Sequence, residues 1–263
     1  MKILLLLLFL PLAAFAQTKW NGYKSAVVLT YDDALNVHLD KVIPELDSAG
    51  FKGTFYLTVS SAAFTERMNE WKLAAAKGHE LGNHTMFHPC AGGTSDRSWV
   101  KPEYDLTTYT LKRVEDEIKM TNVMLQSVDG RTERTFAYPC GDMMAGKQSY
   151  IPAITDDFYA ARGTEQKMLH LGNIDTMTTA CYSMVNTKGE EMINLVKQSM
   201  QQEGLVIFLF HGVGGEHNLN VDLKEHQKLV NFLKQNQKDV WVASFIDVMK
   251  FVKSAQPSTS GKH

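Results

Sequence analysis

Two adjacent carboxylates and two histidines four residues apart are the most chemically suggestive side chains of this sequence. Asp32 and Asp33 follow an apolar run, and His84 and His88 form an i, i+4 pair. Zn²⁺ accepts imidazole nitrogens and a carboxylate while leaving a coordination position open for water. Neighbouring carboxylates are costly to hold together unless a cation or a proton separates their charges. The combination predicts a divalent-metal site, although a helix N-cap and two surface histidines would be the simpler interpretation.

A third candidate is His211, which ends the run LVIFLF and precedes a glycine-rich segment at 212–215. A buried core histidine is one interpretation. Its place at the end of an apolar run and beside a glycine-rich loop favours a side chain presented at the mouth of a strand.

The segments that must position these residues alternate between strand and helix. Apolar runs predict strands, and apolar residues at helical spacing predict helices. The expected strands are 26–30, 53–57, 79–83, 135–138, 158–161, 205–210 and 240–243. The expected helices are 37–46, 66–76, 111–125, one around 192–196, 223–233 and one ending near 252. This alternation predicts an α/β fold with parallel strands, either a barrel or a doubly wound sheet, whose carboxyl ends share one face. All three motifs fall at such ends.

Composition narrows the class of protein. The 263 residues include 44% apolar ones, enough for one large core, and no linker-like segment interrupts the middle. Lys and Arg number 27 against 29 Asp and Glu, and no basic run suggests nucleic-acid binding. The sequence therefore favours a single domain with no nucleic-acid partner.

The N-terminus has the features of a signal peptide. Lys2 precedes an apolar stretch, and Ala14-Phe15-Ala16 supplies small residues for cleavage before Gln17. The stretch is shorter than the roughly 20 residues that span a bilayer. We therefore expect a signal peptide at 1–16, export to the periplasm or the exterior, a catalytic domain at 17–253, a disordered tail at 254–263 and no membrane span.

Four ordered motifs resemble those of the polysaccharide deacetylases, carbohydrate esterase family 4. They are Thr30-Tyr31-Asp32-Asp33-Ala34, His84-Thr85-Met86-Phe87-His88, Phe136-Ala137-Tyr138-Pro139-Cys140-Gly141 and Leu209-Phe210-His211. The resemblance extends over about residues 24–253, and four motifs in order are more specific than any one of them. It implies a single-domain, distorted (β/α) barrel of about seven parallel strands.

The resemblance also implies roles for individual residues. Asp33, His84 and His88 would bind one divalent metal ion, with zinc expected, and Asp32 would be the general base. His211 would be the general acid. The backbone N–H of Cys140 would stabilise the oxyanion, and the substrate would be an acetylated carbohydrate.

Two features depart from the family pattern. Ala137 stands where many members carry the arginine that orients the base. Arg162, at the end of another predicted strand, could replace it, or could be a plain surface residue. The aspartate that tunes the acid histidine is not evident in the sequence, and Asp175 is the candidate for this role.

Three classes of function remain open at this stage. The first is a deacetylase for N-acetylated glycans such as peptidoglycan, chitin oligomers or exopolysaccharide, with an esterase for O-acetylated polysaccharide such as xylan as its sister. The second is a catalytically impaired carbohydrate-binding relative. The third is an unrelated metallohydrolase, although the His-Glu-x-x-His pattern of zinc proteases is absent because Thr85 follows His84.

Three cysteines and one long segment bear on the rim of the site. Cys90 and Cys140 lie in loops expected at the same rim, so they could form a disulfide that leaves Cys181 free. Alternatively, all three are reduced packing residues. The segment 89–109 is expected to build one wall of the cleft, where Trp99 and Tyr104 could stack on sugar rings or pack beneath the loop.

Overall fold

Eight parallel strands form one curled sheet in the computed structural model, which describes residues 20–256. Seven follow the order β7-β4-β3-β2-β1-β9-β8, and β12 also pairs with β1. This confirms the predicted single-domain barrel of parallel strands. The strands are β1 (Ser25–Asp32), β2 (Thr54–Leu57), β3 (Glu80–Asn83), β4 (Thr135–Ala137), β7 (Ala160–Arg162), β8 (Tyr182–Ser183), β9 (Leu205–Phe210) and β12 (Val240–Val242).

Strand β1 is the centre of the sheet and is buried along its whole length. One edge pairs with β9, while the other pairs first with β12 and then with β2. This division of one edge between two strands distorts the barrel. Successive side chains of a strand point to opposite faces. Asp32 therefore shares a face with Ala26 and Val28, while Tyr31 packs on the other side, in the core beneath the helices.

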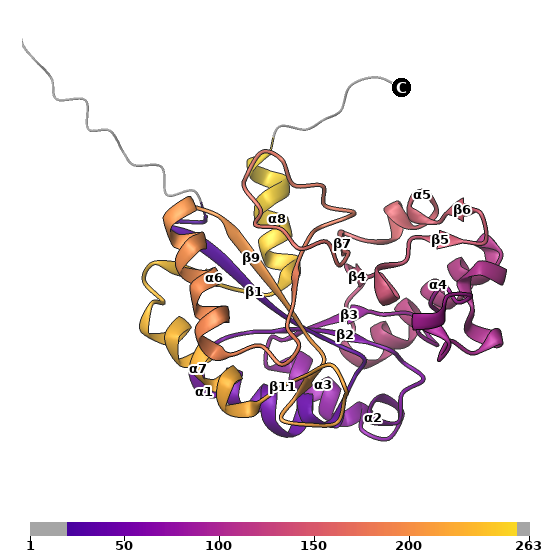
Figure 1. Cartoon of the computed structure of the whole chain (residues 1–263), viewed down its shortest axis with the longest axis horizontal. Coiled ribbons are helices and arrows are strands. Elements are labelled where there is room, and N and C mark those ends of the chain that lie inside the picture. The colour runs from indigo at the N-terminus through magenta and orange to yellow at the C-terminus, as the bar shows by residue number, and fades with distance from the viewer. Residues whose placement is uncertain (1–19, 257–263) are drawn as a thin grey trace, which may run out of the picture.

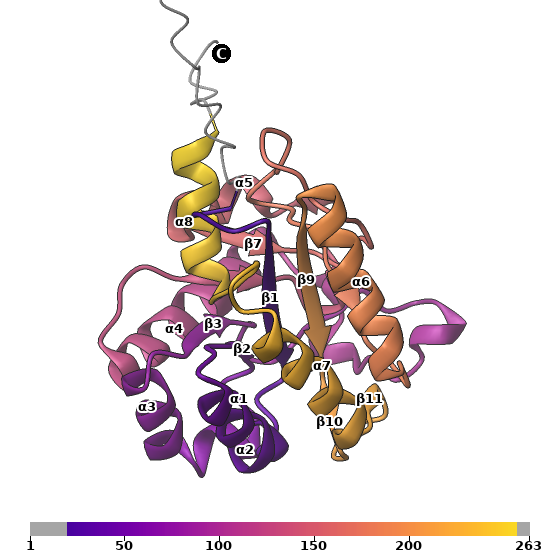
Figure 2. The same cartoon turned by 90° about the vertical axis from the view of Figure 1, so that its left-hand side faces the viewer.

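Helices surround the sheet (Figure 1), with α6, α7 and α1 on one flank and α4 and α5 on the other. Figure 2 shows β1 and β9 side by side between α8 and α6. Each long helix buries one apolar stripe, as Val114, Ile118 and Leu125 do in α4. The helices are α1 (Ile43–Ala49), α2 (Ala62–Thr65), α3 (Met68–Ala76), α4 (Leu111–Asp129), α5 (Ile151–Ile154), α6 (Gly189–Gln202), α7 (Leu223–Gln235) and α8 (Phe245–Ala255).

Several short elements were not predicted from the sequence. The expected helix at 37–46 begins as a five-residue π-helical turn, His38–Val42, which leads into α1. Two small strand pairs also form, β5 (Met144–Ala145) with β6 (Gln148–Ser149) and β10 (Gly212–Val213) with β11 (Asn220–Val221). Two of these short elements adjoin His211: β10 follows it directly, and the π-helical turn contributes a side chain that contacts its carbonyl.

The predicted chain ends are only partly within the described residues. Helix α8 continues through Ala255, so the expected disordered tail at 254–263 begins too early. The expected signal peptide at 1–16 lies outside the described residues. Among residues 20–256, no helix combines the length and the apolar character needed to cross a membrane.

Candidate active site

The predicted metal ligands meet at the carboxyl ends of β1 and β3. Nε2 of His84 lies 3.5 Å from Oδ1 of Asp33, and Nε2 of His88 lies 3.4 Å from the same oxygen. Two atoms bound at about 2.0–2.1 Å to a tetrahedral zinc are about 3.3 Å apart. The three donor atoms all lie within 4.8 Å of one another. This donor set fits one divalent metal ion.

The protonation states of these donor atoms are compatible with binding a metal ion. The Nδ1–H of His84 donates to the carbonyl of Ala137 at 2.8 Å, which leaves Nε2 with its lone pair toward Asp33. Burial lowers the pKa of His84 to about 4, so this imidazole is neutral near pH 7. Burial opposes ionisation of Asp33, but the charges of His88, His84 and other imidazoles outweigh it and lower the pKa of this carboxyl to about 2.

Asp32 faces the same cavity but has a different partner. Nη2 of Arg162 lies 2.7 Å from Oδ1 and 2.5 Å from Oδ2 of this carboxylate, and both side chains are almost fully buried. In the register of β4 with β7, Arg162 is the residue opposite Ala137. The guanidinium is therefore supplied by β7. In many members of the family that the sequence resembles, the arginine stands at the position of Ala137, on the neighbouring strand β4. A surface location for Arg162 is excluded.

His211 approaches the oxygen of Asp33 that His84 and His88 do not face. Its Nε2 is 3.9 Å from Oδ2 of Asp33, and burial lowers its pKa. Its buried Nδ1 has no hydrogen-bond partner within the described chain. Asp175 instead accepts hydrogen bonds from the N–H of Met177 and the hydroxyl of Thr178 in its own exposed turn. The structure does not bring Asp175 to His211, contrary to expectation.

Two further histidines of the site were missed from the sequence. Nε2 of His38 donates to the carbonyl of His211 at 2.8 Å, because Nδ1 of His38 accepts the N–H of Leu35. The ring of His217 stacks on that of His211, with centroids 5.0 Å apart. The only sequence signal that could have pointed to His38 is its position near the Asp32-Asp33 motif. For His217 the signal is its position shortly after the glycine-rich segment at 212–215.

The backbone of the site is strained. Five non-glycine residues of its loops have positive φ, which costs on the order of 1–3 kcal/mol each and concentrates at functional sites. They are Asp33 (80°), Ala34 (56°), Thr85 (64°), His88 (53°) and Cys140 (56°). The surrounding barrel must supply the stability that holds these loops in place.

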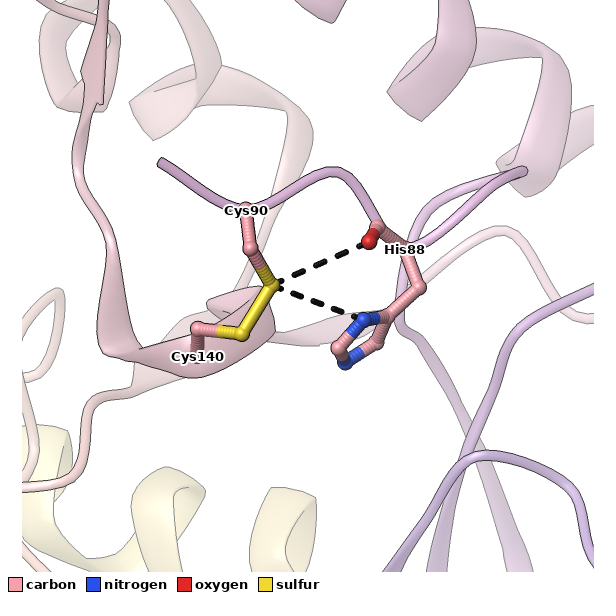
Figure 3. Close-up of side chains that lie close together, drawn as sticks. All are labelled: His88, Cys90 and Cys140. Carbon is pink, nitrogen blue, oxygen red and sulfur yellow. Dashed lines mark hydrogen bonds between the residues drawn. A yellow bond between two sulfur atoms is a disulfide. The ribbon is translucent and has the colours of Figure 1, made fainter. Parts of the chain in front are cut away.

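A disulfide joins two of the strained loops. Cys90 and Cys140 are bonded (Figure 3). Their Cα atoms are 5.9 Å apart. Cys181 is a free, buried thiol. The imidazole of His88 points toward this bridge, with Nδ1 3.6 Å from Sγ of Cys90. A disulfide sulfur is a weak acceptor, so Nδ1–H can donate to it and leave Nε2 for a metal. The sequence left open whether Cys90 and Cys140 form a disulfide, and in the structure they do.

The reactive groups line one cavity of about 670 Å³. Trp99 lines it as well, with 59% of its surface exposed. Tyr104 does not line it and stacks on Phe87, with ring centroids 5.3 Å apart. Of the two aromatic residues considered from the sequence, only Trp99 is placed to meet a ligand.

Comparisons with known proteins agree with this geometry. A model of the polysaccharide deacetylase family matches residues 19–151, about half of the chain. A gellan lyase of a Bacillus species is 28% identical over 71% of this chain and 7% of its own length. Peptidoglycan-N-acetylmuramic acid deacetylase of Bacillus subtilis is 25% identical over 45% of this chain and 39% of its own length. The chain thus spans well under half of either relative.

Solved structures share the fold at low sequence identity. A Mycobacterium smegmatis protein described as a polysaccharide deacetylase superposes with a TM-score of 0.62 at 12% identity, over 92% of this chain and 96% of its own. A carbohydrate esterase family 4 pseudoenzyme of Bacillus anthracis gives 0.53 at 18% identity, over 87% and 66%. The matched family model and the shared barrel together lead to one conclusion: the chain belongs to the polysaccharide deacetylase family.

Proposed function

We propose that this protein removes acetyl groups from a carbohydrate and depends on one divalent metal ion, with zinc the best fit to its ligands. The observation that supports this most directly is the pair of imidazoles, His84 and His88, that face one oxygen of Asp33. When bound there, the metal would polarise the acetyl carbonyl and lower the pKa of a water molecule. Family membership supports the same chemistry.

Asp32 is the base in this proposal. It would take the proton of the attacking water, and Arg162 would orient its carboxylate through two hydrogen bonds. A carboxylate has about four lone-pair sites, so the two bonds to Arg162 leave acceptor capacity for a proton. Because Arg162 is itself buried and held by the carbonyl of Gly163, the base has little freedom to turn away.

Two further groups of the cavity would complete the reaction. The backbone N–H of Cys140, in a left-handed conformation beside the disulfide, would stabilise the oxyanion. His211 would give a proton to the departing nitrogen or oxygen of the sugar. Its Nε2 lies near Oδ2 of Asp33, whereas His84 and His88 face Oδ1.

The proposed substrate is an N-acetylated glycan such as peptidoglycan, chitin oligomers or exopolysaccharide. A signal peptide at 1–16 would export the enzyme to the periplasm or the exterior, where such polymers are found. One Bacillus subtilis relative is named for deacetylation of N-acetylmuramic acid in peptidoglycan. The open cavity with exposed Trp99 at its wall suits a polymeric sugar.

The test is acetate release from purified, zinc-loaded protein. A panel should include peptidoglycan, chitin oligomers and acetylated xylan, each with and without a chelator. Acetate from an N-acetylated glycan that stops with chelator and returns with zinc would support the proposal. Release from xylan alone would favour the sister esterase.

A catalytically impaired, sugar-binding relative is the second candidate, because a structural neighbour is a family pseudoenzyme. The set of side chains in this cavity argues against it: Asp32, Asp33, His84, His88 and His211. Tight glycan binding without acetate release, by protein that has bound metal, would favour this candidate over the enzyme.

A further inference from the structure

His217 is held over the cavity by a loop that is tied to the π-helical turn His38–Val42 and to the two residues before it. The carboxylate of the preceding residue, Glu216, accepts hydrogen bonds from the N–H groups of Asn36 and Val37 at 2.9 and 2.7 Å. It also accepts one from the side-chain amide of Asn36 at 2.7 Å. Nζ of Lys41 donates to the carbonyl of Gly214 at 2.6 Å. These contacts anchor the part of the β10–β11 loop that leads into His217.

The His217 ring is placed among the reactive groups but is more open than they are. It lies nearly parallel to the ring of His211, at an interplanar angle of 15°. Its Nε2 lies 3.7 Å from Oδ2 of Asp33, and its side chain is 32% exposed against 12% for His211. A molecule entering the cavity would therefore reach His217 before it reaches His211.

The hydrogen bonds of His217 define which chemistry it can offer. Its Nδ1 accepts the backbone N–H of Leu219 at 3.0 Å. In the neutral imidazole the proton is then on Nε2, which becomes a donor and cannot also offer a lone pair to a metal. Within the described part of the chain, the metal-ligand group around Asp33 includes His84 and His88 but not His217. His217 is thus a hydrogen-bond donor aimed into the cavity.

The neighbours of His217 are of the types that bind sugars. Asn218 and Leu219 line the same cavity, and Leu219 is 39% exposed. An N–H donor, an amide and an aliphatic surface on one loop match the hydroxyl groups and the apolar faces of a sugar ring. Exposed Trp99, which lines the same cavity from another loop, adds an aromatic surface.

We propose that His217 is a substrate-binding residue whose Nε2–H donates a hydrogen bond to an oxygen of the acetylated sugar, beside the leaving group. This inference rests on the proposed deacetylase function and adds a residue to its substrate site. The bond is made equally in the bound substrate and in the transition state. Its loss therefore raises KM and leaves kcat nearly unchanged.

Three variants separate hydrogen bonding from packing. His217→Ala removes both, His217→Phe keeps a ring against His211 but removes the donor, and His217→Gln restores an N–H near the position of Nε2. For a lost hydrogen bond we expect KM for an N-acetylated chitin trimer to rise roughly 5- to 10-fold in the Ala and Phe variants. The Gln variant should recover most of the loss. His170→Ala, at an exposed site away from the cavity, is the matched control.

Metal content and direct binding complete the test. All variants should retain one zinc, and calorimetry on the zinc-loaded proteins should show the same order of affinities for the trimer. Binding that weakens in the Ala and Phe variants without any acetate release would support His217 and count against the proposed function. Acetate release with an unchanged KM in these variants would overturn the inference alone. Loss of zinc from the Ala variant would also overturn it, because His217 would then be a ligand.

Discussion

The two halves of the barrel build their parts of the site in different ways. In the half from β1 to β4, Asp33 follows β1 while His84 and His88 follow β3, and only β2 separates these two strands. The carbonyl of Ala137 orients His84. In the half from β7 to β12, Arg162 lies on β7 and His211 follows β9, and four strands of the first half stand between β7 and β9. They must reach toward residues of the first half.

The difference is in how much of the sheet each group of residues depends on. The first group depends on three consecutive strands, whereas the second depends on strands far apart in the sheet. The meeting of Asp33, His84 and His88 needs the pairing of β1, β2 and β3 and the conformation of the loops that follow β1 and β3. The approach of Arg162 to Asp32 requires the register of several strands. The family model matches residues 19–151, which end before β7. The second half therefore lies outside the matched residues, and substitutions there should be most informative.

The largest effects should come from the first half. His84→Ala with His88→Ala should abolish both zinc binding and acetate release, since a single carboxylate is left to bind the metal.

Asp33→Asn should weaken zinc binding, while Asp32→Asn should stop turnover and leave zinc bound. Metal analysis and acetate assays check this. Identical behaviour of the two aspartate variants would contradict the roles given to them.

His211→Ala tests the second half directly. Zinc content should be unchanged, and kcat should fall by about 10²- to 10⁴-fold for the loss of a general acid. Single-turnover kinetics on the zinc-loaded variant measure the step itself. A rate near that of the unchanged protein would remove His211 from the mechanism.

Arg162→Ala should leave Asp32 buried and unpaired, at a cost of about 3–5 kcal/mol in the free energy of unfolding, together with loss of activity. Because Arg162 lies opposite Ala137, the double variant Ala137→Arg, Arg162→Ala returns the guanidinium to the neighbouring strand. We expect it to recover part of both losses, as measured by urea unfolding and acetate release. A single Arg162→Ala variant with normal stability would show that the pair contributes little.

The disulfide links the loop that follows His88 to the loop of Cys140, and its loss should have a smaller effect. Its chain separation of 50 residues predicts a loss of about 2–4 kcal/mol on reduction. Because the bond lies at the rim, activity should fall at reductant concentrations that leave the circular dichroism spectrum unchanged. The Cys90→Ser, Cys140→Ser variant is the control, and its activity should not respond to reductant.

The smallest expected effect is that of acid on the contact between His38 and the carbonyl of His211, which joins the two halves. Burial lowers the pKa of His38, which donates to the carbonyl of His211, to about 4. The unfolded imidazole takes up a proton below about pH 6.5, whereas the folded one resists it until about pH 4. Stability is thus complete above pH 6.5 and falls as pH decreases toward 4, by on the order of 2–3 kcal/mol for this group.

Urea unfolding of chelator-treated protein between pH 7 and 4.5 measures this fall without a contribution from metal release. His38→Gln keeps a donor for the carbonyl of His211 but does not titrate, so its stability should vary less with pH. Equal slopes for the two proteins would exclude His38 as a source of the pH dependence.

The sequence by itself predicted seven of the eight strands of the main sheet, the long helices and the side chains that meet as a candidate ligand set. Runs such as LVIFLF are buried on both faces of a parallel sheet, and α4 repeats its apolar residues at helical spacing, so burial leaves a direct pattern. Asp33, His84 and His88 follow strand ends within short motifs. The roles of these residues remain proposals, but their meeting at one place could be predicted from the chain alone.

Only the tertiary structure decided what surrounds Asp32 and His211. That Arg162 faces Asp32 depends on the register of β4 with β7, which no local pattern records. The approach of His38 and His217 to His211, and the separation of Asp175 from it, depend on how distant loops pack. Contacts between residues far apart in sequence arise from the closure of the barrel, so spacing along the chain could not reveal them.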